Sequence, residues 1–126
     1  MSNSKARVIN ILSGASNHPR KGWSSYCASK AAFHMITKQV NLEGKESGIK
    51  CFGFSPGLVK TNMQTNIRKS KINEISFIPE NKMINPIEPA KCIVSIASGK
   101  FDDFDGNFMD IRDEIFNKII SKNLFN

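Results

Sequence analysis

Residues 24–46, SSYCASKAAFHMITKQVNLEGKE, decide the fold of this chain of 126 residues. The segment contains no proline, and its first glycine is Gly44. Its apolar residues recur at helical spacing: Ala28, Ala31, Ala32, Met35, Ile36, Val40 and Leu42. Because the segment is rich in residues that favour helices and lacks those that break them, the spacing predicts one long helix over residues 24–46.

A short apolar run lies on each side of this helix. RVINIL (7–12) ends at the small-residue turn SGAS (13–16), and IKCFGFS (49–55) ends at a Pro-Gly pair. Short apolar runs bounded by turn residues predict buried strands. Strand, helix and strand in this order predict a βαβ unit, in which the strands are parallel and the crossover is right-handed.

The remaining residues predict further helices and a third strand. Residues 60–85 are polar and irregular, which predicts a short helix followed by a mobile loop. NPIE (85–88) is typical of a helix start, with asparagine as the cap, and this helix is expected to stop at Gly99. NFMDI (107–111) predicts a strand, and residues 113–124 predict an amphipathic helix.

Composition and charge exclude several classes of function. Lys+Arg 18 against Asp+Glu 11 give a net charge of +7, but the basic residues are scattered singly, so no nucleic-acid partner is predicted. The apolar runs are too short for a membrane span or a signal peptide. The three cysteines, Cys27, Cys51 and Cys92, cannot all pair and fit no metal-site spacing. We therefore expect free thiols, no metal and a cytoplasmic location.

Three groups of residues suited to chemistry lie where the predicted strands and helix meet. Tyr26 and Lys30 are one turn apart on one helix face, and an ammonium beside a phenol favours the phenolate, which allows proton transfer near neutral pH. Ser13 follows the first strand, at the edge where open α/β sheets bind ligands. PGLVKT (56–61) follows the second strand; its glycine allows close approach to a flat ligand, and its threonine offers a hydroxyl. Each group alone also fits a plainer interpretation: a surface pair, a capping serine or an ordinary turn.

Together and in this order, the three groups resemble the signature of the short-chain dehydrogenase/reductase family. That signature is a serine at a strand end, Tyr-x-x-x-Lys thirteen residues later, and Pro-Gly-x-Val-x-Thr after the next strand. The segments here read INILSGAS (9–16), GWSSYCASKAAFHMIT (22–37) and FSPGLVKTNM (54–63). KGWSSYCASKAA (21–32) and DGNFMDIRD (105–113) look most like the sepiapterin reductase and benzil reductase branch.

The resemblance implies an NAD(P)-dependent oxidoreductase that reduces a small-molecule carbonyl compound to an alcohol, with NADP slightly favoured. Tyr26 would donate the proton, Lys30 would hold the nicotinamide ribose, and Ser13 would orient the carbonyl oxygen. The implied cofactor contacts are Tyr26, Lys30, Pro56, Gly57, Val59 and Thr61. Residues 62–85 would form the substrate loop.

The resemblance covers only the second half of the family's domain. No G-x-x-x-G-x-G or G-x-G-x-x-G occurs in the 126 residues, although such a turn places the cofactor diphosphate at a helix N-terminus. The implied fold is therefore α/β, a partial Rossmann-like three-layer sandwich of about three parallel strands with flanking helices. Residues 1–126 would form one truncated domain that lacks the amino-terminal nucleotide-binding half. One face of the sheet is expected to lack a covering helix, and the outer edge of residues 7–12 to be bare.

Three interpretations of such a chain stay open. It works with a separate N-terminal chain as a split enzyme, it is a remnant without turnover, or it is a basic interaction or dimerisation module with an inherited fold. Cofactor binding by the chain alone is doubtful in each case. The apolar positions Ala32, Met35, Ile36 and Val40 of the long helix need covering, which predicts self-association or a partner chain. The sequence leaves the substrate and the choice between NAD and NADP open.

Overall fold

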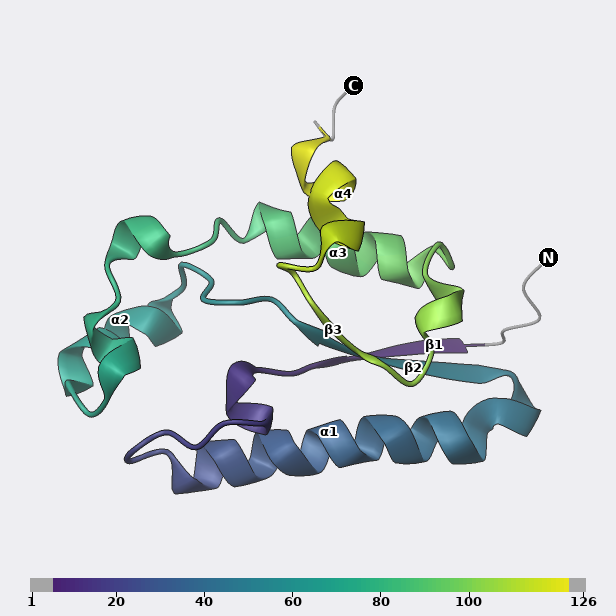
Figure 1. The fold of residues 1–126 in the computed structure, drawn as a ribbon, viewed down its shortest axis with the longest axis horizontal. Coiled ribbons are helices and arrows are strands. Elements are labelled where there is room, and N and C mark those ends of the chain that lie inside the picture. Colours follow the sequence, from purple (N-terminus) through teal and green to yellow (C-terminus); the bar gives the residue numbers. More distant parts are fainter. Residues whose placement is uncertain (1–5, 123–126) are drawn as a thin grey trace.

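Three parallel strands form the sheet at the centre of the computed structural model, which describes residues 6–122 (Figure 1). The strands are β1 (Ala6–Ile11), β2 (Ile49–Ser55) and β3 (Phe108–Asp110), and they lie in the order β1-β2-β3. Both pairings are parallel. The predicted parallel sheet is confirmed, with bounds that differ by one residue at the ends of β1 and β3.

Helices cover both faces of the sheet, as Figure 1 shows. The long helix α1 (Ser24–Gly44) lies along one face, and α3 (Ile87–Ala97) with α4 (Asn117–Ser121) lies over the other. This arrangement confirms the α/β three-layer fold class. The expectation that one face would lack a helix is wrong, because the last third of the chain folds back over the face opposite α1.

The core lies mainly between β2 and the layer formed by α3 and α4. Successive side chains of a strand point to opposite faces, so Phe52 and Phe54 share one face of β2. Both are fully buried, and the Phe54 ring meets the Phe116 ring edge-on with centroids 5.5 Å apart. The buried residues of this cluster are Phe52, Phe54, Cys92, Ile96, Phe101, Met109, Ile111, Phe116 and Ile119. The cluster therefore ties the C-terminal segment to the central strand.

The helices α1 and α3 begin and end close to the residues that the sequence predicts. α1 continues into a 3-10 turn and ends at Gly48, whose φ of 72° is in the left-handed region that glycine adopts freely. The predicted start of α3 is displaced by one residue: Pro86 and not Asn85 is the cap, although Asn85 Oδ1 still accepts a hydrogen bond of 3.1 Å from the Ile87 amide.

The remaining polar segments fold into short helical pieces. The short helix predicted within residues 60–85 is α2 (Asn62–Ser70), and it is followed by the 3-10 turns η3 (Glu74–Phe77) and η4 (Glu80–Lys82). The helix predicted over residues 113–124 is wrong in length. A 3-10 turn comes first, and α4 has five residues before Lys122 turns extended at ψ 132°. Leu124, at the end of that predicted helix, lies outside the described residues.

Apolar side chains remain exposed on the outer face of α1 and along β1. Met35, Ile36 and Leu42 on α1 are 59%, 49% and 71% exposed, and Val8 and Ile11 on β1 are each more than a third exposed. These residues include two of the helix positions predicted to need covering. No helix within residues 6–122 is both long and apolar enough to cross a membrane.

Thiol labelling tests whether the 126 residues pack as described. Cys51 and Cys92 are fully buried, and burial raises the pKa of the Cys92 thiol to about 11. Cys27 is half-buried. Because the thiolate is the reactive form, we expect a thiol reagent at pH about 8 to modify Cys27 quickly and the other two only when the chain opens. Cys27→Ser should remove the fast phase, and rapid reaction of all three thiols would contradict a packed core.

Candidate active site

The loops that follow β1 and β2 leave the sheet at the same edge. The two strands pair in parallel with Ile11 opposite Phe54, and the Leu12 amide extends the ladder by a 2.8 Å hydrogen bond to the Phe54 carbonyl. Ser13 and Pro56 therefore follow at the carboxyl edge of the sheet. The N-terminal end of α1 lies at this same end of the molecule (Figure 1).

Tyr26 and Lys30 share one face of α1, as their spacing predicts. Lys30 Nζ lies 5.8 Å from the centroid of the Tyr26 ring. The same ammonium donates a 2.8 Å hydrogen bond to the backbone carbonyl of Ile11, the last residue of β1. Lys30 thus holds the first turns of α1 against the carboxyl end of β1, with its charge beside the phenol.

The Tyr26 side chain is oriented by its neighbour on the helix and keeps its hydroxyl available. The ring is half-buried and meets the Trp23 ring edge-on, with centroids 5.4 Å apart. Within residues 6–122 the phenol oxygen has no hydrogen-bond partner. The hydroxyl is therefore free to bind an oxygen of a ligand.

Ser13 caps a short turn and still has a donor left. Its Oγ accepts a 3.1 Å hydrogen bond from the Ala15 amide, and its own amide donates to Ser16 Oγ at 3.3 Å. The capping interpretation of Ser13 is therefore confirmed. A hydroxyl has one donor and two acceptor positions, so the O–H of Ser13 remains able to donate to a carbonyl oxygen. The capped turn, η1 (Gly14–Ser16), packs against α1.

The loop of residues 56–61 is fixed by hydrogen bonds to a distant segment. Ile84 donates to the Leu58 carbonyl at 2.7 Å and accepts from the Lys60 amide at 2.9 Å. Gly57 has a φ of 75°, and a Cβ there would lie 2.7 Å from Ile84 Cδ1. A side chain at this position would meet both a strained backbone and a steric clash. Thr61 precedes α2 with an exposed side chain that makes no capping hydrogen bond.

The aspartate that ends β3 was not predicted as part of this edge. Asp110 is the last residue of β3 and accepts hydrogen bonds from the Arg112 guanidinium at 2.8 and 2.9 Å. These bonds lower the pKa of the Asp110 carboxyl, so it is ionised at neutral pH. The two opposite charges of this ion pair lie at the end of β3 and cancel each other. The only signal in the sequence was the position of Asp110 near the end of the strand predicted over residues 107–111.

A clamp between the loop before α1 and the segment after α2 was also missed. Asn73, a buried residue, donates a 2.9 Å hydrogen bond to the Lys21 carbonyl, and Arg20 forms an ion pair with Glu74. The partners are 52 and 54 residues apart, so no local pattern marks them. The clamp holds residues 71–78 against the turn that leads to Tyr26.

Asn73→Ala tests this clamp. The change removes the bonds that Asn73 makes to the Lys21 carbonyl and from the Ile75 amide. Because buried polar groups then lose their partners, we expect the free energy of unfolding to fall by about 1–3 kcal/mol. Urea unfolding followed by the fluorescence of Trp23, the single tryptophan, measures the effect. Asn66→Ala, at an exposed position on α2, should be neutral, and equal midpoints for both variants would contradict the clamp.

Comparison with known proteins shows the family and the fold. The family described as short chain dehydrogenase matches residues 1–72. The benzil reductase ((S)-benzoin forming) of Bacillus cereus is 41% identical over 96 residues, which are 69% of this chain and 39% of that protein. The chain thus spans about two fifths of the length of the curated relatives it matches.

Solved structures give the same fold. A short chain dehydrogenase/reductase from Saccharomyces cerevisiae superposes with a TM-score of 0.75 at 24% identity, over 90% of this chain and 48% of that one. A putative NAD(P) dependent gluconate 5-dehydrogenase from Beutenbergia cavernae, with bound NADP, has a TM-score of 0.70 at 24% identity, over 83% and 43%. The parallel sheet, the paired tyrosine and lysine at its carboxyl edge and the match over more than half of the chain lead to one conclusion: this chain belongs to the short-chain dehydrogenase family of oxidoreductases.

Proposed function

We propose that this chain supplies the proton-transfer side of an NAD(P)-dependent reduction of a carbonyl compound to an alcohol. One observation carries the proposal: the Lys30 ammonium contacts the carbonyl at the end of β1 and lies 5.8 Å from the ring of Tyr26. This contact puts a phenol hydroxyl, a cation and the carboxyl edge of a parallel sheet in one place. Ligands of open α/β sheets bind at that edge.

The proposed chemistry assigns one role to each of three side chains. The nicotinamide, when bound, supplies a hydride to the carbonyl carbon. The Ser13 hydroxyl donates a hydrogen bond to the carbonyl oxygen and orients it. Tyr26 donates to the same oxygen, and its O–H bond breaks as the oxygen gains negative charge, so that the alcohol forms and a phenolate remains. The Lys30 cation stabilises that phenolate until a proton from solvent restores the hydroxyl.

The residues of this edge fit the nicotinamide end of the cofactor. Lys30 and Tyr26 offer a cation and a hydroxyl for the ribose. The loop that contains Pro56, Gly57 and Val59 is held in place by the hydrogen bonds of Leu58 and Lys60 to Ile84, and it would lie along the nicotinamide. The exposed Thr61 hydroxyl has no capping bond to give up. The diphosphate has no comparable position, because the 126 residues contain no glycine-rich turn.

The relatives suggest a first substrate to test. The Bacillus cereus protein is named for the reduction of benzil to (S)-benzoin, and a second benzil reductase, from Bacillus subtilis, is 40% identical to this chain over 83 residues. We therefore propose an activated diketone as a substrate class. Reduction of one of two adjacent carbonyls requires the same proton delivery by Tyr26.

We also propose that the working enzyme contains more than one copy of this chain, or this chain together with a separate nucleotide-binding half. The outer edge of β1 is unpaired within residues 6–122, and the apolar residues Val8, Met35 and Leu42 are exposed. Exposed apolar residues beside an unpaired strand edge are features that a partner chain would cover. A catalytically silent remnant or interaction module remains the alternative proposal.

A product assay tests the proposed function. The chain is combined with the part of the Bacillus cereus relative that it does not match, and benzil is added with NADH or NADPH. We expect loss of reduced-cofactor absorbance together with formation of benzoin, which chiral chromatography identifies. Oxidation of the cofactor without benzoin, or no turnover from a folded and stable complex, would contradict the proposal.

A further inference from the structure

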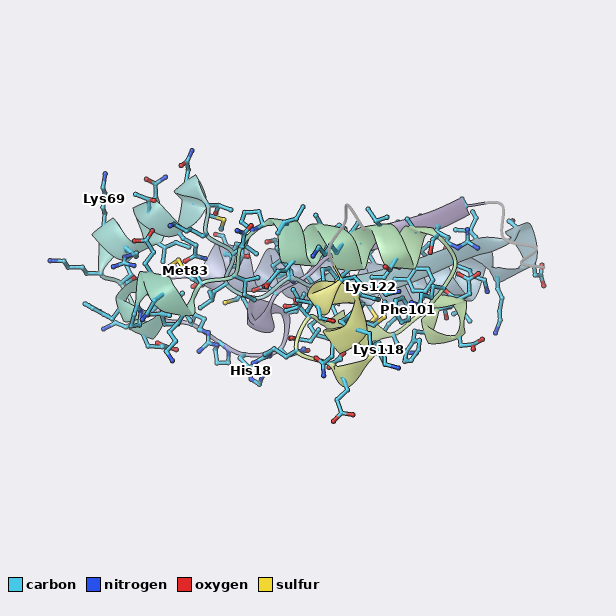
Figure 2. The ribbon with its side chains drawn as sticks, turned by 90° about the horizontal axis from the view of Figure 1, so that it is seen from above. His18, Lys69, Met83, Phe101, Lys118 and Lys122 are labelled. Carbon is cyan, nitrogen blue, oxygen red and sulfur yellow. The ribbon has the colours of Figure 1, made fainter. Side chains whose placement is uncertain are left out.

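A surface hollow lies beside α2, within the segment that the sequence assigned to substrate binding. Its volume is about 510 Å³, and its walls come from the end of the 56–61 loop, from α2 and from residues 80–83. Figure 2 shows Met83 within this lobe of the molecule, and Lys69 projecting from it. The hollow is therefore built by one contiguous stretch of chain, residues 60–83.

Positive charge dominates the walls of the hollow. Lys60, Arg68 and Lys69 line it, against the single carboxylate of Glu80. Lys60 Nζ lies 3.0 Å from Glu80 Oε1, and this hydrogen bond lowers the pKa of the Glu80 carboxyl, with Arg68 acting in the same direction. Glu80 is thus ionised at neutral pH and neutralises one of the three cations.

The other two cations, Arg68 and Lys69, form no ion pair of their own among residues 6–122, although Arg68 is close enough to Glu80 to lower the pKa of its carboxyl. Within residues 6–122, neither Arg68 nor Lys69 makes a side-chain hydrogen bond or an ion pair. A guanidinium presents two parallel N–H groups that match a carboxylate or a phosphate. The hollow therefore offers a net charge of about +2 to an oxyanion.

Gln64 shows that the polar groups of the wall are not satisfied by the chain itself. Its Oε1 is buried and has no hydrogen-bond donor among the described residues. Buried polar atoms are nearly always paired in folded proteins. The missing partner is a hydrogen-bond donor, such as a hydroxyl group elsewhere on the ligand; the anionic group itself does not supply it.

The hollow begins where the proposed cofactor loop ends. Lys60 and Thr61 belong to both. The hollow therefore adjoins the loop to which the proposed function assigns the nicotinamide. We propose that the hollow binds a carboxylate or phosphate of the substrate, so that the enzyme prefers carbonyl compounds that carry such a group over uncharged ones such as benzil. This inference rests on the proposed function, because it concerns the substrate of the same site.

A matched pair of ketones tests the inference on the 126-residue chain. 4-Acetylbenzoate carries a carboxylate, and its methyl ester has nearly the same shape without the charge. We expect the acid to bind at least about fivefold more tightly in a titration followed by NMR, and to shift the amide signals of Gln64 and Arg68. Added salt should reduce the preference, because exposed charges are screened. Equal affinities for the acid and the ester would overturn the inference.

Variants that each change one charge show which residues cause the preference for the acid. Arg68→Gln should weaken binding of the acid about fivefold and leave the ester unchanged. Gln64→Glu places a carboxylate in the wall and should weaken the acid at least as much. Lys45→Gln removes an exposed cation outside the hollow and should have no effect. If Lys45→Gln weakened binding of the acid as much as Arg68→Gln does, the attraction would be non-specific. If ADP shifted the amide signals of Gln64 and Arg68 and the acid did not, the hollow would be a cofactor site. Either result overturns the inference.

The two proposals fail separately. Binding of the acid does not require turnover, so acid binding in the hollow together with full activity of Tyr26→Phe would refute the proposed function alone. Loss of turnover in Tyr26→Phe, together with equal binding of the acid and the ester, would refute only the anionic substrate.

Discussion

Tyr26→Phe is expected to lower the rate of carbonyl reduction by about 10²–10⁴-fold when this chain is combined with a separate nucleotide-binding half, because a positioned general acid contributes a factor of this size. The change removes one oxygen atom and keeps the ring. The contact with Trp23 at 5.4 Å and the position of Lys30 over the ring should therefore persist. The rate of reduced-cofactor consumption at saturating benzil measures the loss.

The control for this variant is a second hydroxyl on the same helix. Ser29 is exposed, and its Oγ donates only to the backbone carbonyl of Tyr26, at 2.9 Å. Ser29→Ala should keep the rate within about twofold, since exposed substitutions rarely change stability or structure. A Tyr26→Phe enzyme that retains most of its activity would show that another group delivers the proton. Circular dichroism of both variants separates this result from a failure to fold.

The sheet and the long helix were predictable because their signals are local. Residues 7–12 and 49–55 are short apolar runs with turns at their ends, and the helix between them has uninterrupted periodicity. The last helix was less predictable. Ile115, Phe116, Ile119 and Ile120 fit helical spacing, but Phe116 is buried against Phe54 and Phe101, and the chain adopts a 3-10 turn to place it there. Tertiary packing overrides propensity in such a short segment.

Some features of the candidate site could likewise be predicted from the sequence, and others could not. The pairing of Tyr26 with Lys30 follows from their spacing on one helix, and the structure agrees. The clamp of Asn73 and the hollow around Arg68 do not follow from the sequence, because both depend on how residues 60–85 fold back. For Ser13, the sequence allowed two roles, a cap of the turn and a ligand-binding hydroxyl. In the structure the hydroxyl caps the turn and still has a donor for a ligand.

The second large effect concerns the 126 residues by themselves. We expect the purified chain to show no appreciable NAD(P)H-dependent reduction of a carbonyl compound. In the proposed site, Tyr26, Lys30 and the loop of residues 56–61 would contact the cofactor, at its nicotinamide end. Without a glycine-rich turn, the diphosphate finds no helix N-terminus of the usual kind. Binding should therefore be weak, and calorimetry with NADPH measures it.

Weak cofactor binding lowers the rate as well as the affinity, because the nicotinamide is then not held in position for hydride transfer. Holding two reactants in the correct relative position lowers the free-energy barrier by about 7–11 kcal/mol. A chain that contacts only one end of the cofactor would lose most of this effect. Adding a nucleotide-binding half that pairs with the bare edge of β1 should restore binding and turnover together. A half with a proline in its pairing strand is the matched control, since proline cannot complete the ladder. Turnover by the chain alone, abolished by Tyr26→Phe, would show that the residues already described hold the cofactor well enough.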